Sequence, residues 1–125
     1  MKTLTPETAK TALDSLMERG LANPKLRNFH VDISWTELAK YVVATPESTA
    51  AMADMINKYP DRFLFGTDEV APTDQAGYLK AFDLYQPMFA RLTPDAKQKV
   101  LKGNYERLFD DARRKVRAWE AAHVK

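Results

Sequence analysis

Two segments of this chain have the pattern of β-strands, and stretches of helical character lie around them. Residues 28–34 alternate apolar and polar side chains, which is typical of a strand with one buried face. Residues 62–66 contain the uninterrupted run Phe63-Leu64-Phe65 and end in glycine, which suits a strand buried on both faces. Two strands separated by helices imply a parallel pair joined by a right-handed crossover. The pattern therefore predicts a helix-rich α/β fold with about two parallel strands.

Five to six helices are expected around these strands. Three begin at Thr-Pro-acid sequences, in which threonine caps free N–H groups, proline takes the first helical position and the acid complements the helix dipole. These starts are Thr5-Pro6-Glu7, Thr45-Pro46-Glu47 and Thr93-Pro94-Asp95. The expected helices span residues 6–19, a short segment after Ser34, and residues 46–58, 74–92, 94–102 and 105–122.

Particular residues mark the expected limits of these helices. Gly20 supplies a C-terminal stop for the first helix. Ser34 and Glu37 have the spacing of a capping box for the second. Pro87 is expected to kink or divide the helix over residues 74–92, and Gly103 lies between the last two helices.

Composition limits the domain count and excludes several partners. With 125 residues, of which 45% are hydrophobic, the chain suits a single domain over residues 1–125. The 19 basic and 17 acidic residues nearly cancel, so no strong field would attract nucleic acid or a membrane surface. No segment approaches the roughly 20 apolar residues of a membrane span. The absence of cysteine excludes disulfides and thiolate sites, and it is consistent with a cytoplasmic location.

The last expected helix is rich in both signs of charge. Asp110 with Arg114 and Asp111 with Lys115 are four residues apart, a spacing that stabilises a solvated helix. We therefore interpret its basic residues as a solvated face, and no nucleic-acid partner is expected.

Asp68 is the first candidate for chemistry, because it follows the second expected strand directly. Parallel α/β folds place their ligands at the C-terminal ends of strands, and a carboxylate delivered there can bind a metal or act as a general base. The loop over residues 67–73 is the one irregular stretch long enough to hold a site. A helix cap or a turn former is the alternative interpretation of an acid at this position.

Three sequence patterns, in order, resemble the amidohydrolase superfamily, specifically its amidohydrolase-related branch. Asn28-Phe29-His30-Val31-Asp32-Ile33-Ser34 is similar to the family's N-[VL]-Y-x-D-x-S strand. Phe65-Gly66-Thr67-Asp68 resembles its F-G-[ST]-D strand, and Gly103-Asn104-Tyr105-Glu106-Arg107-Leu108-Phe109 resembles its closing helix, G-N-x-x-R-[LI]-F. The resemblance implies the C-terminal portion of a metal-dependent TIM-barrel hydrolase or a related decarboxylase.

The same resemblance assigns two roles to Asp68. It matches the aspartate that binds the active-site metal and takes a proton from the attacking water, so Asp68 is the expected catalytic residue and metal ligand. The implied cofactor is a divalent metal, zinc or similar. Family members take their other ligands from an H-x-H pair and from histidines on earlier strands, and this chain has only two histidines. His30 is interpreted as a structural residue and His123 as solvated, so the chain alone is not expected to hold the metal.

Other polar residues near the strands have simpler expected roles. Asp32 lies in a strand expected to be buried, and a structural ion pair is the leading interpretation. Ser34 is interpreted as a helix cap. Glu69 and Asp74 flank Asp68, and the three carboxylates could bind a hard cation adventitiously, although Asp74 also suits a helix cap.

Two functional hypotheses follow. A (β/α)8 barrel needs roughly 250 residues and eight strands, so one copy of this chain is incomplete as a TIM barrel. The first hypothesis is part of a metal-dependent hydrolase, inactive as an isolated chain or completed by a complementary barrel half. The second is a free-standing remnant with a binding or structural role. Because unpaired strand edges tend to associate, a homo-oligomer or a strand-swapped dimer is expected in either case.

Overall fold

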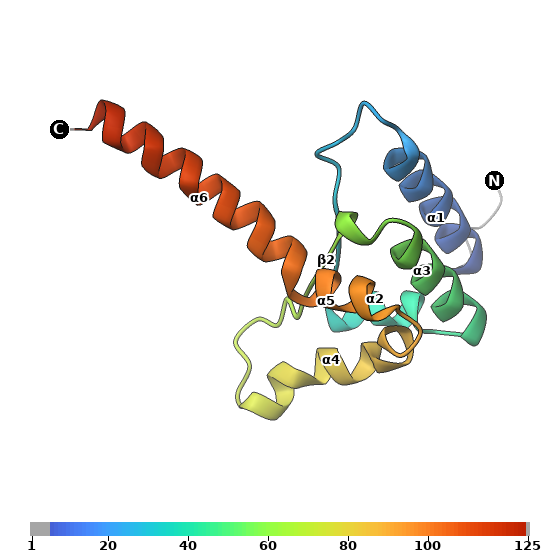
Figure 1. Ribbon diagram of the computed structural model, residues 1–125. Helices are drawn as coiled ribbons and strands as arrows, with labels where there is room; N and C mark the ends of the chain where they lie inside the picture. The colour runs from blue at the N-terminus through green and yellow to red at the C-terminus, as the bar shows by residue number, and fades with distance from the viewer. Residues whose placement is uncertain (1–5, 125) are drawn as a thin grey trace.

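A pair of short parallel strands lies at the centre of the fold (Figure 1). The computed structural model describes residues 6–124, apart from the side chains of residues 6–10, 12 and 13. Strand β1 (Val31–Ser34) pairs in parallel with β2 (Phe63–Gly66). The predicted parallel α/β arrangement is confirmed. Over the described residues, the two strands form an open sheet and not a closed barrel.

Helices make up most of the described chain, and one of them projects away from the rest. They are α1 (Pro6–Ala22), α2 (Thr36–Val42), α3 (Pro46–Lys58), α4 (Gln75–Phe89), α5 (Pro94–Gln98) and α6 (Asn104–His123), with a 3-10 turn η1 (Pro60–Arg62) and a π-helical turn η2 (Lys99–Gly103). Figure 1 shows α1 to α5 gathered around the strands, whereas α6 extends outward as an arm. No helix among the described residues is both long and apolar enough to cross a membrane.

The predicted cap chemistry is confirmed at three helix starts. The Thr45 hydroxyl accepts a hydrogen bond from the Ser48 N–H, and the Ser48 hydroxyl accepts one from the Thr45 N–H. The capping box is therefore complete at α3. At α5 the Thr93 hydroxyl accepts a hydrogen bond from the Ala96 N–H, and at α4 the Asp74 carboxylate accepts one from the Gly77 N–H. Thr5, the third predicted threonine cap, lies outside the described residues.

The prediction that Gly20 ends the first helix is wrong. Helix α1 continues through Gly20 to Ala22. A Cβ atom at Gly20 would lie 2.8 Å from the Phe29 ring, so the glycine permits close packing of the helix on that ring. Glycine is needed here because a side chain would clash with the ring, and not because the backbone is left-handed.

One other local prediction also fails. Ser34 does not cap α2, because Trp35 takes the cap position at φ 80° and makes no side-chain cap hydrogen bond. Pro87 lies near the end of α4, which is one continuous helix and is not divided there. Gly103 lies between the last two helices, as predicted, where it ends the η2 turn that leads into α6.

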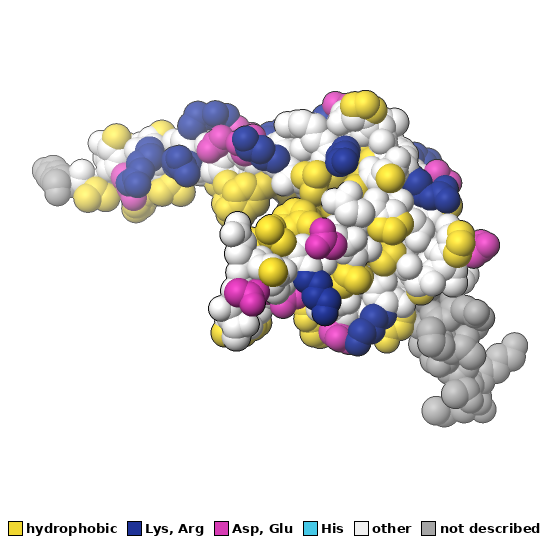
Figure 2. Space-filling model, turned by 90° about the horizontal axis from the view of Figure 1, so that it is seen from below, with side chains coloured by type: hydrophobic (Ala, Val, Ile, Leu, Met, Phe, Trp, Pro, Cys, Tyr) yellow, Lys and Arg dark blue, Asp and Glu magenta, His cyan; other side chains and the backbone are white. Residues whose placement is uncertain are grey.

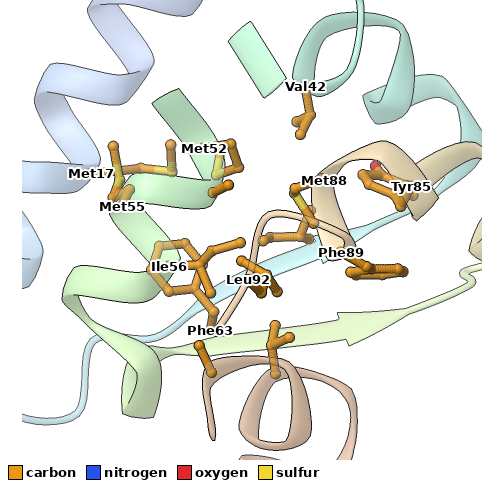
Figure 3. Packing of buried hydrophobic residues seen from close by; sticks show 14 of the residues in the cluster. Met17, Val42, Met52, Met55, Ile56, Phe63, Tyr85, Met88, Phe89 and Leu92 are labelled. Atoms are coloured by element: carbon orange, nitrogen blue, oxygen red, sulfur yellow. The ribbon is translucent and has the colours of Figure 1, made fainter. Parts of the chain in front are cut away.

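The core joins five helices, α1 to α5, to one face of the sheet, and Figure 3 shows part of it. One face of α3 lies in this core, because Met52, Met55 and Ile56 are all buried. On the opposite side of the core, α4 packs on β2 through aromatic rings. The Phe65 ring makes edge contacts with the rings of Phe82, Tyr85 and Phe89 at centroid distances of 5.0–5.1 Å. Edge-to-face packing of this kind adds to the area that the rings bury.

The two faces of the sheet differ in their covering. Because side chains alternate along a strand, Ile33 and Phe63 point to the face covered by helices, and both are fully buried. Asp32 and Leu64, which are paired in register, point to the other face. Asp32 is exposed and Leu64 is partly exposed, so that face is largely uncovered. The expectation that the second strand is buried on both faces is therefore only half met.

Candidate functional site

Asp68 lies in the loop that follows the C-terminal end of β2, as the sequence predicts. Thr67 is buried, at 7% exposure, and continues the packing of the strand, whereas the Asp68 side chain is exposed to solvent. The backbone at Asp68 has φ 48°, in the left-handed region that aspartate tolerates better than most residues. The fold therefore turns sharply at Asp68 and presents its carboxylate at the strand end.

The neighbouring end of β1 is also strained. Ser34 is opposite Gly66 in the register, so Trp35 lies at the level of Thr67. Trp35 has φ 80°, a conformation that costs on the order of 1–3 kcal/mol for a residue with a side chain. Strained backbone of this kind concentrates at functional sites, and here it follows both strands on the same edge of the sheet.

Tyr85 of α4 holds the strained Trp35 segment in place. Its hydroxyl donates a hydrogen bond of 3.0 Å to the Trp35 carbonyl oxygen. Burial raises the pKa of Tyr85, and the charge of Asp32 raises that pKa further. The hydroxyl therefore stays protonated at neutral pH and serves as a neutral donor.

The expected ion pair of Asp32 is absent from the described part of the chain. The carboxylate is exposed, because it points to the uncovered face of the sheet, and it makes no salt bridge with any described residue. The expectation that Asp32 occupies a buried position in its strand is wrong. Asp32 is thus free to meet water or another molecule on that face.

The other two carboxylates of the loop do not join Asp68 in one cluster. Asp74 accepts a hydrogen bond of 2.7 Å from the Gly77 N–H as the α4 cap, which was its predicted structural role. Glu69 is partly buried, and its Oε1 is buried without a hydrogen-bond partner among the described residues. No group of three metal-ligating side chains forms within the described residues, so the adventitious cation site is not supported.

Neither histidine can share a metal ion with Asp68. The ring nitrogen Nδ1 of His30 is 3.1 Å from the Asn28 carbonyl oxygen, which agrees with a structural role. His30 precedes β1, whereas Asp68 follows β2, and at about 3.3 Å per residue the two positions are roughly 20 Å apart along the sheet. His123 lies at the far end of α6, where its ring stacks on Trp119. The residues of this chain therefore do not by themselves fit the expected metal.

At the opposite end of the sheet, the Gly103-Asn104 motif makes a buried polar contact. Asn104 is buried, and its side-chain amide donates hydrogen bonds to the carbonyl oxygens of Pro60 (2.7 Å) and Phe63 (2.9 Å). Arg107, one turn later, donates to the Asp61 carbonyl oxygen at 3.0 Å. The Gly103-Asn104 pattern was the available signal. It marks the point where α6 binds the start of β2.

Comparison with known proteins supports the predicted ancestry. No curated protein and no solved structure matches the chain. A family model described as Amidohydrolase matches residues 6–110, a range that includes both strands, Asp68 and the Asn104 contact. The carboxylate at the strand tip and the amide at the opposite end both lie within the matched range, and the chain belongs to the amidohydrolase family.

Proposed function

We propose that this chain contributes Asp68 as the proton-accepting carboxylate of an amidohydrolase-type active centre, whose remaining groups lie outside the described residues. The observation that carries the proposal is the placement of an exposed carboxylate on a strained turn, at the C-terminal end of a strand within the family match. That edge of a parallel sheet is where α/β enzymes assemble their sites.

The chemistry proposed for Asp68 needs little from its surroundings. A carboxylate can accept a proton from a water molecule that attacks a carbonyl carbon. The buried Thr67 and the left-handed turn fix the direction of the side chain relative to β2. Asp68 therefore orients and deprotonates the water, while binding of the substrate depends on other parts of the centre.

A metal would have to be held largely by other groups. Members of the amidohydrolase family are in general metal-dependent, and a catalytic zinc site requires three protein ligands. The described residues offer one carboxylate at this edge of the sheet and no histidine near it. We therefore propose that the isolated chain does not catalyse hydrolysis and that a complementary barrel half supplies the imidazoles.

Reconstitution tests this proposal. The chain is mixed with a polypeptide that carries the H-x-H strands of an amidohydrolase-related protein, with zinc present, and hydrolysis of ester, amide and lactone substrates is measured. We expect no turnover from the chain alone and turnover from the mixture. Asp68→Asn should lower kcat of the mixture about 100-fold or more, because general-base catalysis contributes about 10²–10⁴.

The control is Asp74→Asn, a second carboxylate of the same loop. Asparagine caps a helix as well as aspartate does, so this variant should retain both the fold and the turnover. Hydrolysis by the isolated chain, or a reconstituted activity that survives Asp68→Asn, would contradict the proposal.

A further inference from the structure

Helix α6 has an apolar face that no described element covers. Tyr105, Phe109, Val116 and Trp119 are between 53% and 59% exposed, and Asn104 is the one buried residue of this helix. Figure 2 shows apolar side chains along one edge of the projecting arm and basic side chains along the other. A shallow groove runs along the apolar edge and is lined by residues of α6.

The spacing of this apolar face is that of a coiled coil. We call it the α6 seam, and its residues are Tyr105, Phe109, Ala112, Val116, Trp119 and His123. The intervals alternate between four and three residues, which gives the 3.5-residue period of helices that wrap around another helix. A helix that only covers a globular core follows a broader stripe with a period near 3.6.

The α6 seam also continues beyond the family pattern. The family match ends at residue 110, yet the helix and its seam run on to His123 at the same spacing. Helices gain most of their stability from the packing of an apolar face and not from intrinsic propensity. A regular seam over these residues therefore requires a partner.

From these observations we propose that residues 105–116 of the α6 seam form the interface for a second copy of this chain, paired antiparallel about a two-fold axis. This arrangement places Phe109 opposite the partner's Ala112 and Tyr105 opposite the partner's Val116, so that large side chains meet smaller ones. A parallel pair would instead crowd Phe109 against its symmetry mate and leave the two Ala112 side chains facing each other.

Charges beside the α6 seam favour the same register. Glu106 and Asp110 lie along the first half of the arm, and Arg113 and Arg117 along the second. Antiparallel pairing sets Glu106 of each copy beside the partner's Arg113. Glu106 makes an exposed contact of 3.4 Å with Lys102 of its own chain, whereas Arg113 makes no ion pair within the described residues and is available to a partner. The predicted pairing of Asp110 with Arg114 does not form, because Arg114 contacts Asp111.

Two alanines on the same helix provide a matched test. Ala112 lies in the α6 seam, whereas Ala118 lies off it, and both are exposed in one copy. We expect the wild-type chain to be a dimer by analytical ultracentrifugation. Ala112→Glu buries an unpaired carboxylate and should raise the dimer dissociation constant roughly a hundredfold or more. Ala118→Glu adds the same charge to the same helix and should leave that constant unchanged.

Cross-linking tests the direction of pairing, because the natural chain has no cysteine. Tyr105→Cys and Val116→Cys copies, mixed and oxidised, should form a mixed disulfide, since bridged residues have Cα atoms about 5.5–6 Å apart. Circular dichroism verifies that each variant remains helical. A monomeric wild-type chain, or a dimer that resists Ala112→Glu and so uses another surface such as the strand edges, overturns the proposal. Disulfides only between identical variants overturn the antiparallel register. These outcomes are independent of hydrolase activity.

Discussion

The two ends of the β1–β2 sheet are built in opposite ways. At the N-terminal end, side chains bind backbone carbonyl groups. Asn104 donates to Pro60 and Phe63, Arg107 donates to Asp61, and the Arg62 Nε donates to the Phe29 carbonyl oxygen at 2.7 Å. These contacts join segments that are 33 to 46 residues apart in the sequence, so they tie the fold together.

At the C-terminal end, the backbone is strained and the chain is exposed. All of the non-glycine residues with positive φ among the described residues, Trp35, Asp68 and Ala71, lie in the loops that follow the two strands. Residues 70–80 are all exposed. The comparison indicates that one end of the sheet provides stability, whereas the other keeps polar groups accessible for chemistry, which is the division found in parallel barrels.

The largest expected effect is at the stabilising end. Asn104→Ala leaves two backbone carbonyl groups buried without their donor, and it should lower the free energy of unfolding by about 2–3 kcal/mol. Urea denaturation measures this loss. Asn57→Ala is the control, because its amide also makes two backbone contacts but is only half-buried, and it should cost about 1 kcal/mol. If both variants lost the same free energy of unfolding, Asn104 would not stabilise the fold more than a half-buried asparagine does.

Tyr85→Phe should have an intermediate effect with a distinctive pH dependence. Loss of the hydrogen bond to Trp35 should lower the free energy of unfolding by about 1 kcal/mol at neutral pH. The pKa of Tyr85 is raised in the folded state, so above pH 10 the unfolded tyrosine ionises first and wild-type stability falls. The phenylalanine variant lacks this loss.

The difference between the two proteins should therefore be constant below about pH 10 and shrink above it, as measured by urea denaturation across the pH range. Tyr41→Phe, at an exposed tyrosine, is the control and should change neither the free energy of unfolding nor its pH dependence. A difference that grows above pH 10 would show that Tyr85 ionises in the folded protein.

The smallest expected effect is at the strained end, where Trp35→Gly and Trp35→Ala are compared. Both remove the side chain, so the difference between them isolates the backbone. At φ 80°, glycine should be more stable than alanine by about 1 kcal/mol. The same pair at Tyr41, inside α2, should show the opposite sign, with glycine about 1 kcal/mol less stable. Thermal denaturation of the four variants gives both differences, and a like sign at the two sites would exclude strain at Trp35.

Much of the framework could be predicted from local chemistry. The Thr45 and Thr93 caps, the extent of α3 and the parallel pairing follow from residue types at fixed spacings, because the interactions involved are close in sequence. The position of Asp68 could also be predicted, since the end of an apolar strand is visible in the sequence.

The failures have a common physical origin in contacts between distant segments. Gly20 is explained by the Phe29 ring packed against it, and no local pattern reveals this contact. Trp35 adopts a conformation usually reserved for glycine, while a hydrogen bond from Tyr85, 50 residues away, holds its carbonyl. Alternation shows that Asp32 lies on the polar face of its strand, but it does not show whether other elements cover that face. Asp32 was therefore expected to need a partner, although it is exposed.

The π-helical turn η2 sets an angle as well as joining two helices. It lies between the Thr93-capped α5 and the first residue of α6, and its hydrogen bonds run from residue i to i+5, one residue further along the chain than in an α-helix. Consecutive helical residues differ by about 100° around the axis, so Asn104 can face β2 while Tyr105 faces outward. Loss of a single residue from this turn would rotate everything after it by that amount, so that the outer aromatic would face β2 in place of the inner amide.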